Sequence, residues 1–285
     1  MAKAFPWFVG DYKIQRNHVL GDGMQAEVVP GEHILTGKSV VAKITTLNTK
    51  QSCKLYKSEV SILEKLKNCD GIVQMECYFS LENYGITILE RMPHDLMTLI
   101  EEDRLTLPQR LEIFKLVAFA IKQCHEKDIA HLDLKPENIL VSADYSSIRL
   151  CDFGNAQVVP KHGLVRSGSG TLLYAAPENL HAEFFDGKKS DIWSLGILYH
   201  VLISYHWPYV INGDKDLKKK ISRGQISIDS NVSEPQVQIL MQMLQIHPQD
   251  RIDINALCTV LQPPRQNTKL IKRSSFKRLT KLLKL

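Results

Sequence analysis

The sequence predicts an α+β protein of two lobes, a small β-rich lobe followed by a larger, mainly helical one. Two observations lead to this prediction. Residues 11–91 contain short β-branched and apolar runs separated by glycines, with one helical interruption. Residues 92–264 contain longer segments in which apolar residues recur every three or four positions. A chain of 285 residues, 44% of them hydrophobic, is long enough to bury a sizeable core.

The small lobe is expected to contain strands on both sides of one helix. HVLGDGMQAEVV (18–29) is typical of a strand, a glycine turn and a second strand, and KSVVAKITTL (38–47) of a β-branched strand. CKLYKSEVSILEKLKN (53–68) has the apolar stripe of a helix. IVQMECYFS (72–80) and GITILERM (85–92) return to the strand pattern.

The large lobe is expected to be built from helices. LPQRLEIFKLVAFAIKQCHEK (107–127) reads as a long buried helix with Pro108 in its first turn, where proline is tolerated. SDIWSLGILYHVLIS (190–204) and VQILMQMLQI (237–246) are further helical patterns. Residues 92–95 would join the two lobes.

The composition argues against several classes of protein. No apolar run approaches the ~20 residues of a membrane span, and no signal peptide is expected before Asp11. The six cysteines form no C-x-x-C pair, so neither a zinc site nor a disulfide framework is expected. A reducing compartment, the cytoplasm and/or the nucleus, fits this cysteine usage best.

The net charge of +5 is unevenly distributed. Eight of the 36 basic residues lie in 265–285, which contain no acid, so 28 basic residues face 31 acidic ones in 1–264, a net charge of −3. The main domain is therefore mildly acidic and the basicity belongs to a C-terminal tail. No specific binding of nucleic acid is expected.

The small lobe contains two features suited to phosphate chemistry. Glycines in GDGMQAEV (21–28) would let backbone N–H groups approach phosphate oxygens closely, although the same pattern suits a plain hairpin. VVAK places Lys43 in a strand expected to be buried, where an ammonium group needs a partner. Glu59 on the following helix is the candidate partner, or else a solvated helix residue.

Two polar motifs follow in the large lobe. HLDLKPENIL concentrates His131, Asp133, Lys135 and Asn138 within eight residues, which suits either a polar loop or an arrangement that transfers a phosphoryl group. LCDFGNA places Asp152 after an apolar strand and before a Phe-Gly turn, where its carboxylate can point at a cation. SGTLLYAAPENL, SDIWSLG and HPQDRI come next along the chain.

Taken in this order, these motifs resemble the signature of the eukaryotic-type protein kinases: Gly-rich loop, V-A-I-K lysine, H-R-D-L-x-x-x-N loop, D-F-G and A-P-E. The resemblance implies the bilobal protein kinase fold, with a small antiparallel sheet and one helix in the first lobe. It predicts a kinase domain over 11–264, divided into an N-lobe (11–91) and a C-lobe (92–264), and a basic tail over 265–285.

The resemblance also implies roles for individual residues, with ATP and Mg²⁺, or Mn²⁺ in its place, as cofactors. Asp133 would accept the proton of the substrate hydroxyl, and Lys135 would neutralise charge on the transferred group. Lys43 would hold the α- and β-phosphates and pair with Glu59. The metal ligands would be Asn138 and Asp152.

The nucleotide would lie between the lobes. The backbone of Glu90 and Met92 would bind adenine, and Asp95 is placed to reach the ribose. The other residues expected to bind the nucleotide are Leu20, Gly21, Gly23, Val28, Ala42, Lys43 and Leu140.

Other matched positions are expected to be structural. Glu178 would pair with Arg251, and Asp191 would brace the loop that contains Asp133. The side chains expected to stack between the lobes are Leu63, Met75, His131 and Phe153.

The sequence departs from the family pattern in two places. Ala26 stands where the third glycine is usual. Leu132 replaces an arginine that in other kinases binds a phosphate on the activation segment, here residues 152–178. Because leucine cannot bind phosphate, activity is expected not to depend on phosphorylation of this segment. Cys151, beside Asp152, is either a small buried residue or a reactive thiol.

Three functions are compatible with these motifs. Lys135 and Thr171 match the serine/threonine branch of the protein kinases. Small-molecule phosphotransferases of the aminoglycoside or choline type share the His-x-Asp…Asn loop but lack the D-F-G, A-P-E and D-x-W elements. A non-catalytic scaffold would not be expected to keep every catalytic residue. Within the kinases, the similarity is to the calcium/calmodulin-dependent group, and Glu137 with Asp95 predicts a modest preference for basic protein substrates.

The tail, RQNTKLIKRSSFKRLTKLLKL, would present an apolar stripe on a basic helix. Such helices bind calmodulin-like proteins, anionic membranes or acidic grooves, including one on the chain's own acidic domain. A solvated end or a nuclear-import patch is also compatible. KRSSF predicts autophosphorylation at Ser274 or Ser275.

Overall fold

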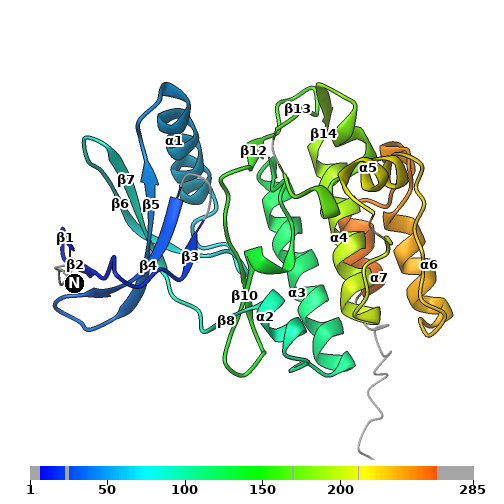
Figure 1. The fold of residues 1–285 in the computed structure, drawn as a ribbon, viewed down its shortest axis with the longest axis horizontal. Helices are drawn as coiled ribbons and strands as arrows, with labels where there is room; N and C mark the ends of the chain where they lie inside the picture. The colour runs from blue at the N-terminus through cyan, green and yellow to red at the C-terminus, as the bar shows by residue number, and fades with distance from the viewer. Residues whose placement is uncertain (1–6, 23–25, 169, 211, 262–285) are drawn as a thin grey trace, which may run out of the picture.

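The computed structural model describes residues 7–22, 26–168, 170–210 and 212–261. A β-sheet with one helix forms the first lobe, and the helices of the second lobe lie beside it, joined to it through the chain that follows β7 (Figure 1). This is the α+β, two-lobed architecture that the sequence predicts. Gly23 and the tail 265–285 lie outside the described residues.

The N-lobe sheet is antiparallel throughout, in the order β1-β2-β4-β5-β7-β6, with β3 paired to β4. Its buried face gathers β-branched residues of β4, β5 and β7 into a core of its own. The strands are β1 (Trp7–Val9), β2 (Tyr12–Ile14), β3 (Gly21–Asp22), β4 (Ala26–His33), β5 (Ser39–Thr46), β6 (Met75–Ser80) and β7 (Tyr84–Glu90). The sheet thus begins before the strand-rich region that the sequence predicts from residue 11.

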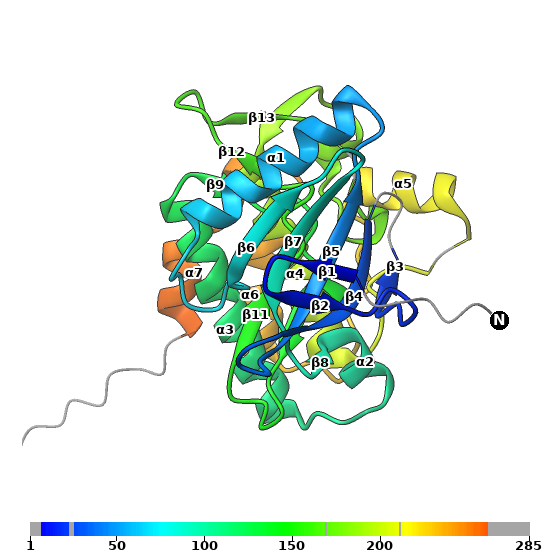
Figure 2. The same ribbon diagram turned by 90° about the vertical axis from the view of Figure 1, so that its left-hand side faces the viewer.

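Helix α1 (Lys50–Lys65) lies against this sheet (Figure 2). It begins three residues before the predicted 53–68 because Thr49 and Ser52 form a capping box. It also ends earlier, since the backbone leaves helical geometry at Leu66 and Asn68 is left-handed with φ +63°. The buried face of α1 contains Tyr56, whose hydroxyl donates to the carbonyl of Phe79 at 2.9 Å and so fixes the helix to the sheet.

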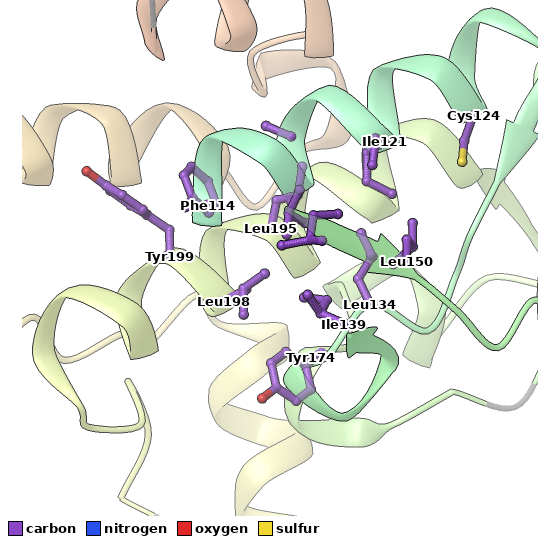
Figure 3. Close-up of a cluster of buried hydrophobic side chains, with 14 of the residues drawn as sticks. Phe114, Ile121, Cys124, Leu134, Ile139, Leu150, Tyr174, Leu195, Leu198 and Tyr199 are labelled. Carbon is purple, nitrogen blue, oxygen red and sulfur yellow. The ribbon is translucent and has the colours of Figure 1, made fainter. Parts of the chain in front are cut away.

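The C-lobe is built around α3, which packs against α4 and α7. The side chains between α3, α4 and the loop that contains Asp133 form one buried apolar cluster, including Phe114, Ile121, Leu134 and Leu195 (Figure 3). The helices described in the C-lobe are α2 (Leu96–Glu101), α3 (Leu107–Glu126), α4 (Gly187–Ser204), α5 (Asp214–Ser222), α6 (Glu234–Met243) and α7 (Ile254–Leu261). None of the helices described is long and apolar enough to cross a membrane.

The predicted C-lobe helices are present, with shifted ends. Helix α4 begins at Gly187 rather than at residue 190 because the Asp186 carboxylate caps it, accepting from the Lys189 N–H at 3.1 Å. Helix α6 begins at Glu234, after a capping box of Ser233 and Gln236, and ends at Met243 rather than at residue 246. The sequence patterns gave no expectation of α2, α5 or α7.

Short strand pairs place the loops of the C-lobe. They are β8 (His94–Asp95) and β11 (Ile148–Leu150) on either side of β10 (Ile139–Val141), β9 (Ile129–Ala130) with β12 (Gln157–Val158), and β13 (Leu164–Arg166) with β14 (Phe184–Asp186). The loop 131–138 runs from β9 to β10, and the activation segment starts directly after β11. The C-lobe therefore presents both polar motifs from the ends of paired strands.

Candidate active site

Two ion pairs that share Lys43 join the two lobes. Lys43 lies in the middle of β5, and its Nζ is 2.5 Å from Glu59 Oε1 on α1 and 2.7 Å from Asp152 Oδ1. The Lys43 and Glu59 side chains are largely buried, whereas that of Asp152 is half exposed. The predicted partner of Lys43 is therefore present, and Asp152 is a second one.

The neighbouring charges favour the ionised forms of Lys43 and Asp152. Burial by itself lowers the pKa of Lys43, but the carboxylates of Glu59 and Asp152 outweigh it and raise the pKa above its ordinary value. Burial likewise favours a raised pKa for Asp152, and the Lys43 ammonium outweighs it and lowers the pKa. Asp152 therefore presents a carboxylate at neutral pH.

Local geometry directs Asp152 away from its neighbour Phe153. Asp152 has a left-handed backbone, φ +58°, which is unusual for a residue other than glycine. Phe153 is buried, and its ring lies 4.9 Å from that of His131, centroid to centroid. The apolar side chain is thus held in the core while the carboxylate next to it stays between the lobes.

The loop that contains Asp133 is held from below by Asp191 of α4. The buried Asp191 carboxylate accepts from the backbone N–H groups of His131 at 2.9 Å and Leu132 at 2.8 Å, and it also contacts His125 Nε2 at 2.9 Å. Charge-assisted bonds of this kind are strong when buried. The bracing role predicted for Asp191 is confirmed by these contacts.

The Asp133 carboxylate is held differently at its two oxygens. Oδ1 accepts from the Thr171 N–H at 3.0 Å and from its hydroxyl at 2.8 Å. Oδ2 lies 3.6 Å from Lys135 Nζ and 3.4 Å from the amide nitrogen of Asn138. Lys135 Nζ in turn donates to Thr171 Oγ1 at 3.0 Å. Oδ1 therefore accepts two short hydrogen bonds, whereas the contacts of Oδ2 are longer.

The proposed metal ligands offer oxygen atoms of the kind that Mg²⁺ prefers. Asn138 donates through Nδ2 to the carbonyl of Asp133 at 2.8 Å, which leaves its Oδ1 for a cation. Asp152 receives Lys43 at Oδ1, which leaves Oδ2. One carboxylate and one amide oxygen suit Mg²⁺, which keeps waters and substrate phosphates as its other ligands. The donor chemistry thus fits the metal, although the residues' role remains a prediction.

The residues expected to bind the nucleotide come from both lobes. In the N-lobe sheet, Gly21 pairs with Val28 across β3 and β4, and Ala42 is buried on β5. In the C-lobe, Leu140 of β10 pairs with Asp95 of β8. Leu20 is partly exposed, Met92 half-buried.

Glu90 and Asp95, near the connection between the lobes, also make contacts that stabilise the fold. The Glu90 carboxylate accepts from Arg149 Nε at 2.9 Å and from the Gln74 N–H at 2.8 Å. The Asp95 carboxylate caps α2, accepting from the Thr98 N–H at 2.8 Å and its hydroxyl at 2.7 Å. The ribose contact of Asp95 and the adenine contacts of Glu90 and Met92 stay predictions.

An apolar cluster orders the activation segment from within the C-lobe. It is named here the segment cluster and consists of Ala130, Leu132, Val159, Val165, Ala182 and Phe185. Two strand pairs, β12 with β9 and β13 with β14, hold Ala130, Val165 and Phe185 of this cluster in place. The sequence motifs give no sign of β13 or β14, because neither strand has more than three residues.

The remaining predicted supports also have the expected partners. Arg251 makes a two-pronged ion pair with Glu178, at 2.6 and 2.7 Å, and its guanidinium is fully buried. Leu63 and Phe153 belong to the main core, and Met75 packs against it. These contacts hold the end of the activation segment and the stack between the lobes.

Cys151 is a partly buried residue that packs against the main core. Burial raises its pKa to about 12, and the neighbouring Asp152 acts in the same direction. Because the thiolate is the reactive form, this favours the interpretation as a small buried residue over a reactive cysteine.

Residues 14–261 match the protein family described as "Protein kinase domain". The chain is 32% identical to serine/threonine-protein kinase D2 of Rattus norvegicus over 256 residues, 86% of this chain and 29% of that protein. It is 30% identical to serine/threonine-protein kinase D3 of Homo sapiens over 256 residues, 86% and 28% respectively. It is also 30% identical to the protein kinase domain-containing protein ppk9 of Schizosaccharomyces pombe over 253 residues, 87% and 46%. The chain thus spans less than a third of the length of the first two relatives.

Proposed function

This chain belongs to the protein kinase family, and we propose that it transfers the γ-phosphoryl group of ATP to serine or threonine hydroxyls of protein substrates. One observation supports the proposal most directly. The ion pair of Lys43, Glu59 and Asp152 is closed while Asp133 is bonded to Thr171, so both halves of the site have the order that phosphoryl transfer needs.

The residues divide the reaction between them. Lys43 binds the α- and β-phosphates, and Glu59 keeps its ammonium group in place. Asp133 accepts the hydroxyl proton while the acceptor oxygen bonds to the γ-phosphorus and the bond from that phosphorus to the leaving ADP oxygen breaks. Lys135, 3.6 Å from Asp133 Oδ2, neutralises negative charge on the phosphoryl group in transfer.

Asn138 and Asp152 would hold Mg²⁺, or Mn²⁺, through the oxygens that their other contacts leave available. When bound, the cation neutralises charge on the β- and γ-phosphates. The chain's own contribution is to fix both ligands, Asn138 through the Asp133 carbonyl and Asp152 through Lys43.

The alternative functions fit the site less well. A scaffold without catalysis would have no need for a closed Lys43–Glu59 pair, which orders a buried ammonium for phosphate. A small-molecule phosphotransferase would have no need for the ordered segment that ends in the Glu178–Arg251 pair. We retain both as outcomes of the test below.

The substrate preference that we propose is a modest one for basic residues before the acceptor, as in the calcium/calmodulin-dependent group. Glu137 is an exposed residue of the loop that contains Asp133, where a carboxylate can bind an arginine of the substrate. Asp95 contributes less than the sequence suggests, because both of its oxygens already accept bonds within α2.

The basic tail is proposed to bind a calmodulin-like protein or an anionic membrane and to be autophosphorylated at Ser274 or Ser275, in the cytoplasm and/or the nucleus. The support is its sequence alone, with eight basic residues and no acid over 265–285. Truncation after Pro264 should raise activity or change location, and should remove most of the autophosphorylation.

A positional-scanning peptide library with radiolabelled ATP and Mg²⁺ tests the proposed function. The wild type should label serine and threonine peptides, with basic residues favoured before the acceptor, and Asp133→Asn should label none. Labelling of aminoglycosides or choline but not peptides would favour the second alternative. ATP binding without any labelling would favour the scaffold.

A further inference from the structure

A second side chain of the activation segment contacts the Asp133 carboxylate. Asn155 Nδ2 lies 3.4 Å from Asp133 Oδ2, the oxygen that Thr171 does not occupy. Asn155 stands directly after the Asp-Phe-Gly turn, and nothing in the motifs described above gives it a role. Asp133 is thus held by residues near both ends of one segment, Asn155 at Oδ2 and Thr171 at Oδ1.

The two amides near Oδ2 are not equivalent. Asn138 is buried and donates its Nδ2 to the Asp133 carbonyl at the shorter distance of 2.8 Å, so its bond to Oδ2 at 3.4 Å is secondary. Asn155 is half-buried and lines a cavity of about 320 Å³ that opens beside Asp133, together with Thr171 and Leu172. An acceptor hydroxyl bound at Oδ2 would therefore lie near the Asn155 amide.

The length of the bond is consistent with a group that orders the carboxylate rather than one that binds it tightly. A bond of 3.4 Å is weak, and hydrogen bonds at catalytic groups often shorten only when the substrate is bound. A strong donor would also hold the lone pairs that must accept the hydroxyl proton. A weak amide donor fixes the rotation of the carboxylate while it leaves lone pairs of Oδ2 available.

We propose that Asn155 is a positioning residue, which holds Asp133 Oδ2 toward the acceptor hydroxyl. The proposal rests on the proposed kinase function. Because Asn155 follows Asp152 by three residues, this contact also links the geometry of the nucleotide side to the base on the peptide side. A shift of the Asp-Phe-Gly turn would move the amide away from Oδ2 and leave that oxygen with only its long contacts to Asn138 and Lys135.

Steady-state kinetics with a serine peptide test this role in three variants. Asn155→Ala removes the donor and should lower kcat about tenfold, with KM for ATP changed less than twofold. Asn155→Asp has the same shape but cannot donate when ionised, so its kcat should fall at least as far. Asn155→Gln keeps the donor and should retain more activity than Asn155→Ala. The exposed Asn231, changed to Ala, is the matched control and should leave both constants unaltered.

The outcomes separate positioning from packing and from a failed functional assignment. Wild-type kcat in Asn155→Asp would overturn the proposal, because shape alone would then suffice. So would a fall in kcat matched by a rise in KM for ATP or by a lower melting temperature, since that pattern indicates general disorder. A wild type that labels no peptide in the same assay overturns the proposed function, and this inference with it.

Discussion

The side of the candidate active site that we propose binds the nucleotide is ordered by charge, whereas the side that we propose binds the peptide is ordered by apolar packing and strand pairing. On the first side, the Lys43 ammonium holds Glu59 of α1 and Asp152 together. On the second side, the segment cluster buries Val165 and Phe185 against Leu132. The geometry of the first side therefore depends on two ion pairs of one lysine, while that of the second side depends on many apolar contacts.

The packing of the segment cluster requires a strained backbone at Leu132. Its backbone is left-handed, with φ +64°, which costs a leucine roughly 1–2 kcal/mol. The bond from its N–H to the Asp191 carboxylate, at 2.8 Å, and packing in the segment cluster offset this strain. An arginine there would order the segment through a phosphate, whereas leucine orders it through the core.

The largest expected effect comes from the charged side. Lys43→Met should lower kcat by several orders of magnitude, because the substitution removes the ammonium that we propose holds the phosphates and leaves Glu59 and Asp152 without their shared partner. The melting temperature should fall, because the buried Glu59 carboxylate loses its partner, but the protein should still fold, since methionine fills the space of the lysine stem. Single-turnover assays with Mg²⁺-ATP measure the rate. Activity within tenfold of the wild type would show that charge does not order this side.

The Lys43–Glu59 pair and the burial of Leu63 and Phe153 between the lobes were predicted from the sequence motifs, whereas the Lys43–Asp152 pair and the segment cluster were not. Lys43, Asp133 and Asp152 lie in short motifs whose residues are close together in the chain. The segment cluster joins Leu132 to Phe185 across more than 50 positions, and β13 and β14 are too short to leave a pattern. Asn155 was missed for the same reason, because its contact is set by where two loops meet.

The ends of the helices show a second limit of the sequence. Apolar periodicity located α1 and α6 but not their ends, which depend on capping boxes at Thr49 and Ser233. Helix α5 was not expected because its exposed face is rich in lysine and only Leu217 and Ile221 are buried. Apolar periodicity detects a helix through its buried face, and a short surface helix such as α5 buries few residues.

The second largest effect is on stability and concerns a charge in the C-lobe. Glu178→Ala should lower the free energy of unfolding by about 3–5 kcal/mol, since it leaves the buried Arg251 guanidinium unpaired. Chemical denaturation measures this. Glu183→Ala is the matched control, because its ion pair with Arg166 is exposed and should contribute almost nothing. Equal effects would mean that the buried pair is no more important than the surface one.

A smaller effect is expected from the segment cluster. Val165→Ala should raise KM for the peptide about threefold to tenfold and leave KM for ATP within twofold, because it loosens the segment without touching the ion pair of Lys43. Leu164, its neighbour on β13, is 41% exposed, so Leu164→Ala should leave both constants unchanged. If Val165→Ala weakens ATP binding instead, the two sides of the site are not ordered separately.

The smallest effect is expected from removing phosphate. Ser167 is already ordered without modification, since its N–H donates to the carbonyl of Glu183 at 2.7 Å and the adjacent Arg166 pairs with Phe184 across β13 and β14. Leu132 offers no charge to a phosphate on this segment. Phosphatase treatment, and Ser167→Ala, should therefore change kcat less than twofold in the peptide assay. The double variant with Ser169→Ala extends the test to a serine outside the described residues. A loss of more than tenfold in any of these would show that the segment cluster alone cannot order the peptide side, and that a cation other than residue 132 receives the phosphate.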